Sequence, residues 1–218
     1  YPQSKSDQTE YKVPEGVKTI GKNAFNGNKT ITKIELPKSV QSIGDYAFIY
    51  CGSMEEIKLS EGLEEIGREA FEYCSGIKKA EIPDSVKEIG TEAFYSCGSL
   101  EEVVLGKGLE KVGGETFRYC EKLTKLTIEG NIESIDSSVF YDTAIKELQV
   151  GKGVSSLKET LYGQGALEKI EVEEGNESYI SEDGVLYNKE KTTLIRYPQS
   201  KSDQTEYKVP EGVKTIGK

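Results

Sequence analysis

Apolar positions along this chain recur with a period of 23 residues. In each unit an Ile/Leu/Val pair two residues apart, such as Ile34 and Leu36, precedes a Pro or Gly turn. A second apolar pair, such as Val40 and Ile43, follows the turn and leads into an Ala-Phe pair. Alternation with period 2 predicts a short strand with one buried face, and Pro and Gly end such strands. Each unit therefore predicts one coil: strand, turn, second extended piece, then a helical turn or irregular backbone.

One column of the repeat is aromatic. All six phenylalanines of the chain fall in it, 23 positions apart: Phe25, Phe48, Phe71, Phe94, Phe117 and Phe140. A single coil of this length cannot bury its own apolar face, so neighbouring coils must stack into a continuous core. We therefore predict a solenoid of about eight coils with parallel strands and with the Phe column inside.

A second column contains the four cysteines, each three residues after a Phe: Cys51, Cys74, Cys97 and Cys120. Four thiols in one stacked row cannot surround a metal ion tetrahedrally, and the chain has no His. We expect buried structural thiols that form an interior ladder. A disulfide between adjacent coils is the alternative, disfavoured because the side chains point the same way.

The fullest copy of the repeat, residues 31–51, is ITKIELPKSVQSIGDYAFIYC. Its spacing of Leu, Ile, Pro, Gly, Ala-Phe and Cys resembles the BspA-type leucine-rich repeat, which is also found in treponemal surface proteins. The resemblance covers residues 11–172 and implies a β-rich α/β solenoid, a right-handed leucine-rich repeat superhelix. It also implies an extracellular or cell-surface protein that adheres to other proteins. Departures at Thr116, Asp136 and Val139 predict less regular later coils.

The chain divides into two parts of one continuous solenoid. Residues 1–172 form the repeated coils, with residues 1–10 expected to fray. Residues 173–218 form an enlarged irregular unit, in which Gly184–Asn188 and Thr192–Tyr197 are predicted to pair as a hairpin. This unit ends in residues 197–218, an identical copy of residues 1–22.

The duplicated ends suggest a window cut from a protein with a larger repeating unit of 196 residues; a chosen or engineered boundary is the alternative. We expect residues 1–8 to move more than residues 197–204, which have a hairpin partner. The C-terminal copy carries Val209, Val213 and Ile216 without an obvious polar cap. End-to-end self-association is therefore a further hypothesis.

Composition excludes several classes of function. The formal net charge is −10, which is unlike the basic footprint of a nucleic-acid-binding protein. No apolar run approaches the roughly 18 residues of a membrane span. No nucleophile elbow, phosphate-binding loop, dinucleotide fingerprint or zinc motif is recognisable. We therefore expect no enzymatic activity, no cofactor and no membrane insertion.

Charged residues follow the predicted strands in two outward columns. The first alternates strictly in sign: Lys33, Glu56, Lys79, Glu102, Lys125, Glu147 and Lys169. We interpret these charges mainly as a solvated ladder that avoids stacking like charges; a polar recognition face is the alternative. The second column loses its charges at Val104, Thr127 and Gln149, which are our candidate protein-contact patch. Tyr50, Tyr73 and Tyr119 form a second candidate stripe, although they could equally cover the cysteine column.

Two functions of different classes remain open. The first is an extracellular protein-binding module that uses the strand face, because solenoids offer extended binding surfaces. The second is a structural spacer without a ligand of its own. The first function implies a protein partner, which the resemblance leaves unidentified.

Overall fold

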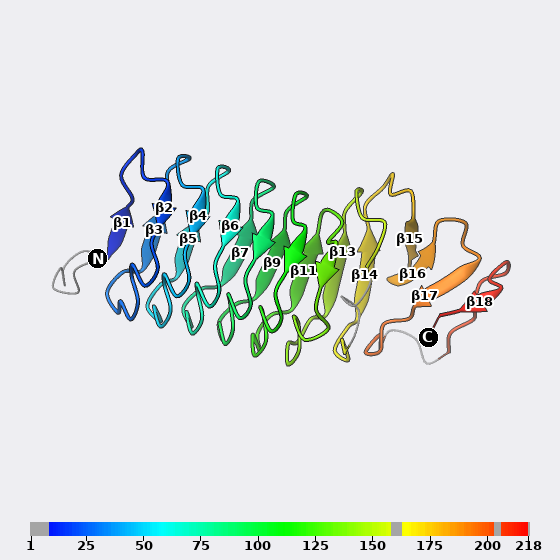
Figure 1. The fold of residues 1–218 in the computed structure, drawn as a ribbon. Helices are drawn as coiled ribbons and strands as arrows, with labels where there is room; N and C mark the ends of the chain where they lie inside the picture. Colours follow the sequence, from blue (N-terminus) through cyan, green and yellow to red (C-terminus); the bar gives the residue numbers. More distant parts are fainter. Residues whose placement is uncertain (1–8, 158–162, 203–205, 218) are drawn as a thin grey trace.

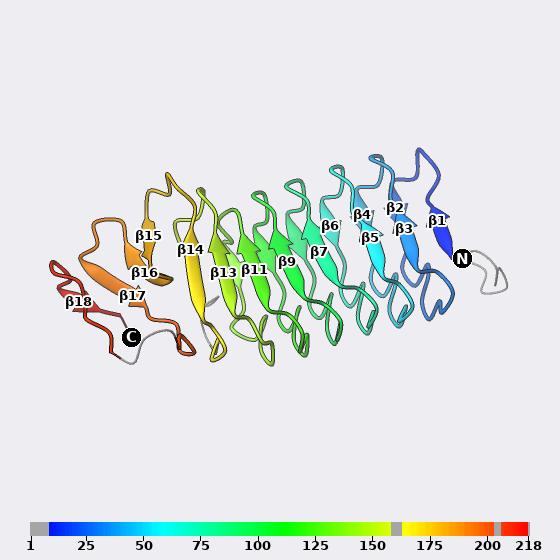
Figure 2. The same cartoon turned by 180° about the vertical axis from the view of Figure 1, so that it is seen from behind.

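The chain folds into an elongated stack of coils, with the N-terminal coil at one end and the C-terminal segment at the other (Figures 1 and 2). The structure is a computed structural model, and it describes residues 9–157, 163–202 and 206–217. The expected difference between residues 1–8 and 197–204 rests partly on positions outside these residues. Within them, no helix is long and apolar enough to cross a membrane.

Two sets of parallel strands run along the stack. The longer strands, which we call the major strands, are β1 (Glu10–Lys12), β3 (Lys33–Glu35), β5 (Glu56–Lys58), β7 (Lys79–Ile82), β9 (Glu102–Leu105), β11 (Lys125–Ile128), β13 (Glu147–Val150) and β14 (Lys169–Val172). They form a three-stranded sheet, β1-β3-β5, and a five-stranded sheet that runs from β7 to β14. The expected parallel arrangement is therefore confirmed.

The minor strands follow the Pro or Gly turns and form one six-stranded sheet. They are β2 (Thr19–Ile20), β4 (Ser42–Ile43), β6 (Glu65–Ile66), β8 (Glu88–Ile89), β10 (Lys111–Val112) and β12 (Ser134–Ile135). Their register joins residues of the same column, such as Ile20 with Ile43 and Ile66 with Ile89. Because the period is constant, each apolar side chain meets an equivalent side chain in the next coil.

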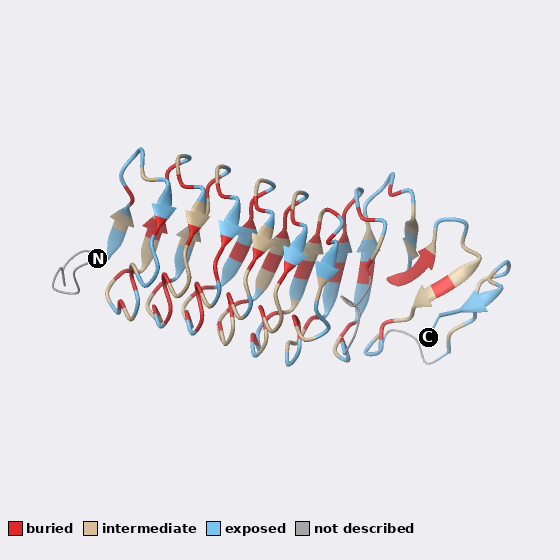
Figure 3. Ribbon diagram, in the orientation of Figure 1, coloured by how far each residue is buried: buried red, intermediate tan, exposed pale blue. Residues whose placement is uncertain are grey.

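The core is one continuous cluster that follows the stack from Val13 to Leu186, and buried positions recur along successive coils (Figure 3). All six Phe side chains are buried. Neighbouring Phe rings stack, with centroids 4.9 to 5.5 Å apart and interplanar angles of 3° to 19°. This separation suits favourable aromatic pairs, so the Phe column forms a spine through the coils.

The Ala-Phe segments contain no helical turn among the described residues; they are turns. The α component of the expected α/β class is therefore wrong, and the fold is a β-solenoid. The physical reason is the left-handed residues in these turns, with φ between 52° and 61° at the non-glycine positions. They stand two before and two after the Phe: Asn23, Tyr46, Glu69, Glu92 and Glu115, and Tyr50, Tyr73, Ser96, Tyr119 and Asp142. An α-helix of L-residues cannot propagate through that conformation.

The four cysteines line the interior beside the Phe spine, and all four are buried free thiols. Each Sγ lies within hydrogen-bond distance of the Phe carbonyl oxygen one coil earlier. The distances are 3.1 Å from Cys51 to Phe25, 3.1 Å from Cys74 to Phe48, 3.2 Å from Cys97 to Phe71 and 3.3 Å from Cys120 to Phe94. Burial raises the pKa of the Cys120 thiol to about 12. The column therefore ties successive turns together through buried thiols.

The enlarged C-terminal unit breaks the parallel pattern. Strand β15 (Tyr179–Glu182) pairs antiparallel with β16 (Val185–Asn188), which pairs antiparallel with β17 (Thr193–Arg196). Strand β18 (Thr215–Ile216) then lies parallel to β17. A small second core of Val185, Tyr187 and Leu194 packs against Tyr197, Tyr207 and Val213.

Candidate functional site

Val104, Thr127 and Gln149 lie side by side on three neighbouring major strands. The register pairs Thr127 with Val104 on one side and with Gln149 on the other. Val104 and Thr127 are half-buried, whereas Gln149 is exposed. Their neighbours along each strand point into the core, as alternation requires. The three residues therefore form one uncharged row on the outer face of β9, β11 and β13.

Charges beside this row neutralise one another across the coils. In the alternating column, Lys79 pairs with Glu102 at 2.9 Å and Lys125 with Glu147 at 3.9 Å. Nearer the N-terminus, Lys33 pairs with Glu56 at 2.9 Å. All these groups are well exposed, so each pair contributes about 0–1 kcal/mol. The ladder favours correct stacking of the coils and leaves little unpaired charge on this column.

The uncharged row borders an open depression of about 530 Å³. Thr127 and Gln149 line one side, and Val172 and Glu173 line the C-terminal side. Val104 does not line this depression. It lines a separate hollow of about 320 Å³ together with carboxylates that include Glu81 and Asp84. Of the three candidate residues, the structure thus brings two to one concave site.

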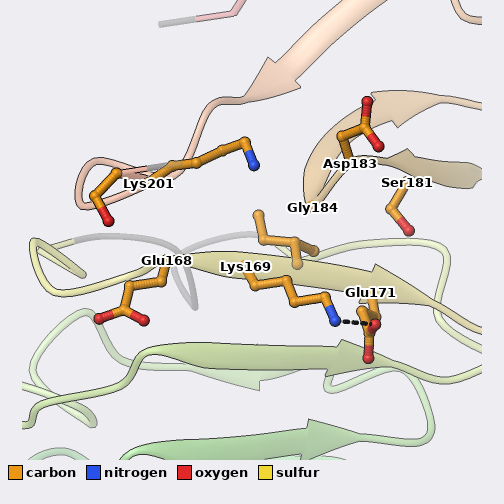
Figure 4. Close-up of a pocket in the computed structure, with 9 residues that line it drawn as sticks. Glu168, Lys169, Glu171, Ser181, Asp183, Gly184 and Lys201 are labelled. Atoms are coloured by element: carbon orange, nitrogen blue, oxygen red, sulfur yellow. Dashed lines mark ion pairs between the residues drawn. The ribbon is translucent and has the colours of Figure 1, made fainter. Parts of the chain in front are cut away.

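A second depression, of about 550 Å³, lies between β14 and the turn from β15 to β16 (Figure 4). It is lined by Glu168, Lys169, Ile170, Glu171, Ser181, Asp183, Gly184, Lys201 and Ser202. Both depressions include Glu171 and Ser181, so they adjoin. We call the two together the β14 notch.

Two hydrogen bonds hold the β15–β16 hairpin against β14. The Val172 amide donates to Ser181 Oγ at 2.9 Å, and the Ile170 amide donates to the Gly184 carbonyl oxygen at 2.9 Å. Asn176, which is buried, fixes the approach to the hairpin: its side chain donates to the carbonyl oxygens of Gly151 and Val154. The wall of the notch is therefore rigidly attached to the last major strand.

The notch is lined mainly by polar and charged side chains. Lys169 forms an ion pair with Glu171 (Figure 4), and this partner raises the pKa of the lysine. The Ser181 hydroxyl already accepts a backbone hydrogen bond, and the chain has no His to act as its base. Among the described residues, no group of three acidic, Cys or His side chains is placed to hold a metal ion. The notch therefore presents hydrogen-bonding and charged groups to solvent.

Sequence reasoning missed most of the notch. Ser181, Asp183 and Lys201 come from the irregular unit, where no column of the repeat assigns them a position. The only local signal was Asp183-Gly184, a pair typical of a tight turn between two strands. Which strand that turn packs against depends on contacts beyond the repeat.

The tyrosine stripe lies on the edge formed by the Ala-Phe turns. Tyr50, Tyr73 and Tyr119 are exposed, and the Tyr50 and Tyr73 rings stack with centroids 5.1 Å apart. Tyr95 continues the row by edge contacts with Tyr73 and Tyr119. Because these rings pack on one another, the stripe presents mostly ring edges and hydroxyl groups to solvent.

Comparisons with known proteins agree with the repeat. The pattern described as "BspA type Leucine rich repeat region" matches in six copies, over residues 3–122, 41–168 and 87–207. No curated protein sequence gives a significant match.

Three solved structures are similar to this chain. A leucine-rich cell surface protein of Faecalibacterium prausnitzii is 30% identical, with a TM-score of 0.61, over 94% of this chain and 58% of that protein. A leucine-rich repeat protein of T. pallidum is 28% identical, with a TM-score of 0.55, over 74% of this chain and 68% of that one. The pneumococcal vaccine antigen PcpA is 26% identical, with a TM-score of 0.52, over 98% of this chain and 52% of that one. The chain thus spans little more than half the length of the first and the third.

Proposed function

Since the chain belongs to the BspA-type leucine-rich repeat family, we propose that it is a non-enzymatic, extracellular protein-binding module of adhesion type. The partner contacts the outer face of β9 to β14 and inserts a segment into the β14 notch. One observation carries this proposal: Thr127 and Gln149 of the uncharged row line the depression of about 530 Å³, which adjoins the depression of about 550 Å³. The cell-surface protein among the similar structures supports an extracellular location.

The physical argument concerns desolvation. Charged side chains must lose bound water before a partner can pack on them, and this desolvation costs free energy. The desolvation cost is small for Val104 and Thr127, which carry no charge. Rims of interfaces are typically polar and their centres are depleted in charge. The uncharged row flanked by Lys–Glu pairs has this arrangement, and the notch adds a concave end.

The test compares binding by two matched variants. Val104→Glu combined with Gln149→Lys adds charges to the row without touching the core. Ser134→Glu adds a charge to an exposed position of the minor sheet. Pull-downs from host matrix and cell-surface extracts should yield a partner, which is then purified and titrated directly against all three proteins.

We expect affinity to fall about tenfold or more for the double variant and to stay unchanged for Ser134→Glu. Equal affinity of all three proteins for the partner would show that the strand face does not bind it. The second candidate function is a structural spacer in a larger repetitive surface protein. Its support is the self-neutralised ladder, and it requires that no extract yield a partner that binds the purified chain directly.

A further inference from the structure

Arg118 lies in a cage of side chains on the edge formed by the Ala-Phe turns. Its guanidinium carbon lies 4.8 Å from the centre of the Tyr119 ring and 5.4 Å from the centre of the Tyr141 ring. Its nitrogen atoms form ion pairs with Glu115 at 3.0 Å and with Asp142 at 3.6 Å. Aromatic rings and carboxylates together are the groups that recognise an organic cation. We call these four residues the Arg118 cage; they show how this edge of the stack holds a guanidinium.

Two coils earlier, the repeat places the same kinds of side chain around a different centre. One acid and both rings of the cage recur 46 residues upstream, as Glu69, Tyr73 and Tyr95. The central position holds Glu72 instead of an arginine, and Ser96 stands in place of the second acid. The Tyr73 and Tyr95 rings meet edge to face, with centroids 5.9 Å apart. This group, which we call the Glu72 site, therefore has the rings and the acid of a cation cage, with a carboxylate at its centre.

Glu72 is a buried carboxylate without a cationic partner. It is 9% exposed and forms no ion pair with any described residue. The arginine of the preceding turn, Arg68, pairs instead with Glu69 at 2.8 Å and with Glu92 at 3.5 Å. Three carboxylates thus share one arginine. A carboxylate that is buried beside like charges is stabilised in its ionised form by an opposite charge at close range, so the site has an unmet preference for a second cation.

The rings of the Glu72 site are open to solvent and decide which cation fits. Tyr73 is exposed, and Tyr95 is half-buried beside it. Within the part of the chain that the structure describes, no three acidic, Cys or His side chains are placed to hold a metal ion. A planar guanidinium stacks on aromatic rings and also forms paired hydrogen bonds with a carboxylate. An arginine side chain therefore suits both kinds of group at this site.

We propose that the Glu72 site binds the guanidinium group of an arginine side chain that a protein partner supplies. The guanidinium contacts the Tyr73 and Tyr95 rings and pairs with the Glu72 carboxylate, as Arg118 does within its own cage. Tyr and Arg dominate the binding energy of many protein interfaces, and here the chain supplies the tyrosines. The site lies on the Ala-Phe turns and not on the major strands, so it is independent of the function proposed for the strand face and the β14 notch.

A peptide titration tests the site. The probe is the tripeptide Gly-Arg-Gly with blocked ends, and the control is the same peptide with citrulline, which has nearly the shape of arginine but no charge. Nuclear magnetic resonance of the ¹⁵N-labelled chain follows the backbone amides. We expect saturable shifts at Glu72 and Tyr73 with millimolar arginine peptide and none with the citrulline peptide. Equal shifts with both peptides, or no shift at these residues, would overturn the proposal.

Two variants of the site distinguish binding from a nonspecific effect of charge. Glu72→Arg supplies the cation from the chain itself and should abolish the shifts. Tyr73→Leu keeps an apolar side chain but removes a ring, and should weaken binding about two- to fivefold, as the loss of an exposed cation–π contact does. Circular dichroism confirms that each variant is folded. Undiminished affinity in either folded variant would contradict the assignment.

The Arg118 cage supplies the matched comparison. Arg118→Ala empties that cage, so the arginine peptide should produce a second set of shifts, at Tyr119 and Tyr141, while the shifts at Glu72 persist. Binding at both places would show that the shared rings and acids recognise the guanidinium. Shifts at the emptied cage alone would show that the Glu72 site does not bind it, and would overturn the proposal.

The affinity of the arginine peptide should also depend on pH, because arginine stays charged while Glu72 titrates. Burial and the two neighbouring carboxylates raise the pKa of Glu72 to about 8, and Arg68 opposes them. The Tyr73 hydroxyl and the Cys97 thiol also face this carboxylate; burial raises the pKa of each, so both stay neutral at pH 7. Since only ionised Glu72 pairs with the cation, affinity should rise about tenfold from pH 7 to pH 9. Titrations at the two pH values measure this, and equal affinity would overturn the proposal.

Discussion

Gly90 shows how little space separates one coil from the next. A Cβ atom added to this residue would lie 2.6 Å from the Arg68 backbone nitrogen and 2.7 Å from the Gly67 carbonyl carbon, both in the preceding coil. Gly21 occupies the same column in the first described coil, and an added Cβ there would meet nothing within 4 Å. The column therefore contains Gly because coils stack, and not because the turn itself requires it.

We expect Gly90→Ala to lower the free energy of unfolding by about 1–3 kcal/mol, since the clash is with backbone that cannot rotate away. Gly21→Ala is the matched control and should change stability by less than about 0.5 kcal/mol. Urea unfolding followed by circular dichroism measures both. Equal effects at the two positions would show that stacking is not the cause.

Glu72, which directly follows Phe71, is a buried carboxylate. It is buried beside Glu69, and burial, followed by its hydrogen bond to Glu69, raises the pKa of Glu72 to about 8. Glu92 adds to this effect, whereas Arg68 opposes it. Because the pKa of this acid is higher in the folded state than its ordinary value of 4.5, folding is favoured when Glu72 is protonated. This stability is present at low pH and is lost as pH rises from about 4.5 to about 8.

Glu72→Gln removes that titration while keeping the shape of the side chain. The variant should melt about 2 °C or more above the parent protein at pH 9, and the difference should shrink towards pH 5. Differential scanning calorimetry across this range is the measurement, with the exposed Glu64→Gln as control. A difference in melting temperature that is independent of pH would contradict the assignment.

At the scale of elements, the Phe spine and the turns around it stabilise each other. Phe71 lies between Phe48 and Phe94, with ring centroids 5.1 and 4.9 Å away. Two left-handed residues, Glu69 and Tyr73, flank the ring in this coil. Non-glycine residues in that conformation cost about 1–3 kcal/mol each and persist only where packing over-determines them. The buried spine provides that packing.

Phe71→Ala should therefore reduce the free energy of unfolding by about 3–5 kcal/mol, as large-to-small substitutions in a core do. Tyr50→Ala removes an aromatic ring from the exposed edge of the neighbouring turn and should cost less than about 1 kcal/mol. Chemical denaturation of both variants provides the comparison. Unchanged stability of Phe71→Ala would mean that the spine is not part of the interior.

At the scale of the whole molecule, each coil depends on its neighbours, so position in the stack decides the environment of a sequence. The duplicated ends give a comparison within one chain. The Val13 amide donates to Glu35, whereas its copy at Val209 has no backbone acceptor among the described residues. The second equivalent pair shows the opposite. The Gly217 amide donates to the Leu194 carbonyl oxygen at 2.7 Å, whereas the Gly21 amide has no backbone acceptor among the described residues.

Hydrogen exchange should report this reversal. At low protein concentration we expect the Val13 amide to be protected and that of Val209 to exchange fast, with Gly217 protected and Gly21 fast. Resolved amide resonances in a nuclear magnetic resonance experiment distinguish the two copies. Matching protection at equivalent positions would show that neighbours do not determine local order here.

A fixed period of 23 was enough to predict parallel strands, a stacked core and the positions of Phe48, Phe71 and Phe94 within it. The period was sufficient because every coil packs against coils of the same kind. The local pattern of apolar residues and the packing between coils therefore predict the same buried positions. The candidate row of Val104, Thr127 and Gln149 was found in the same way, since strand alternation assigns its face. The β14 notch was not predicted from the sequence, because Ser181 and Lys201 lie outside the repeat.

The sequence by itself determined the coil, its stacking and its buried columns, because equal spacing places like residues together whatever the details of the backbone. Only the tertiary structure decided three further features. Left-handed residues give irregular backbone, not a helical turn, beside each Phe. The hairpin folds back on β14, and the identical residues 10–21 and 206–217 differ in which of their sides is covered. The reason is common to all three: each depends on contacts with a neighbouring coil or hairpin, and no local pattern records them.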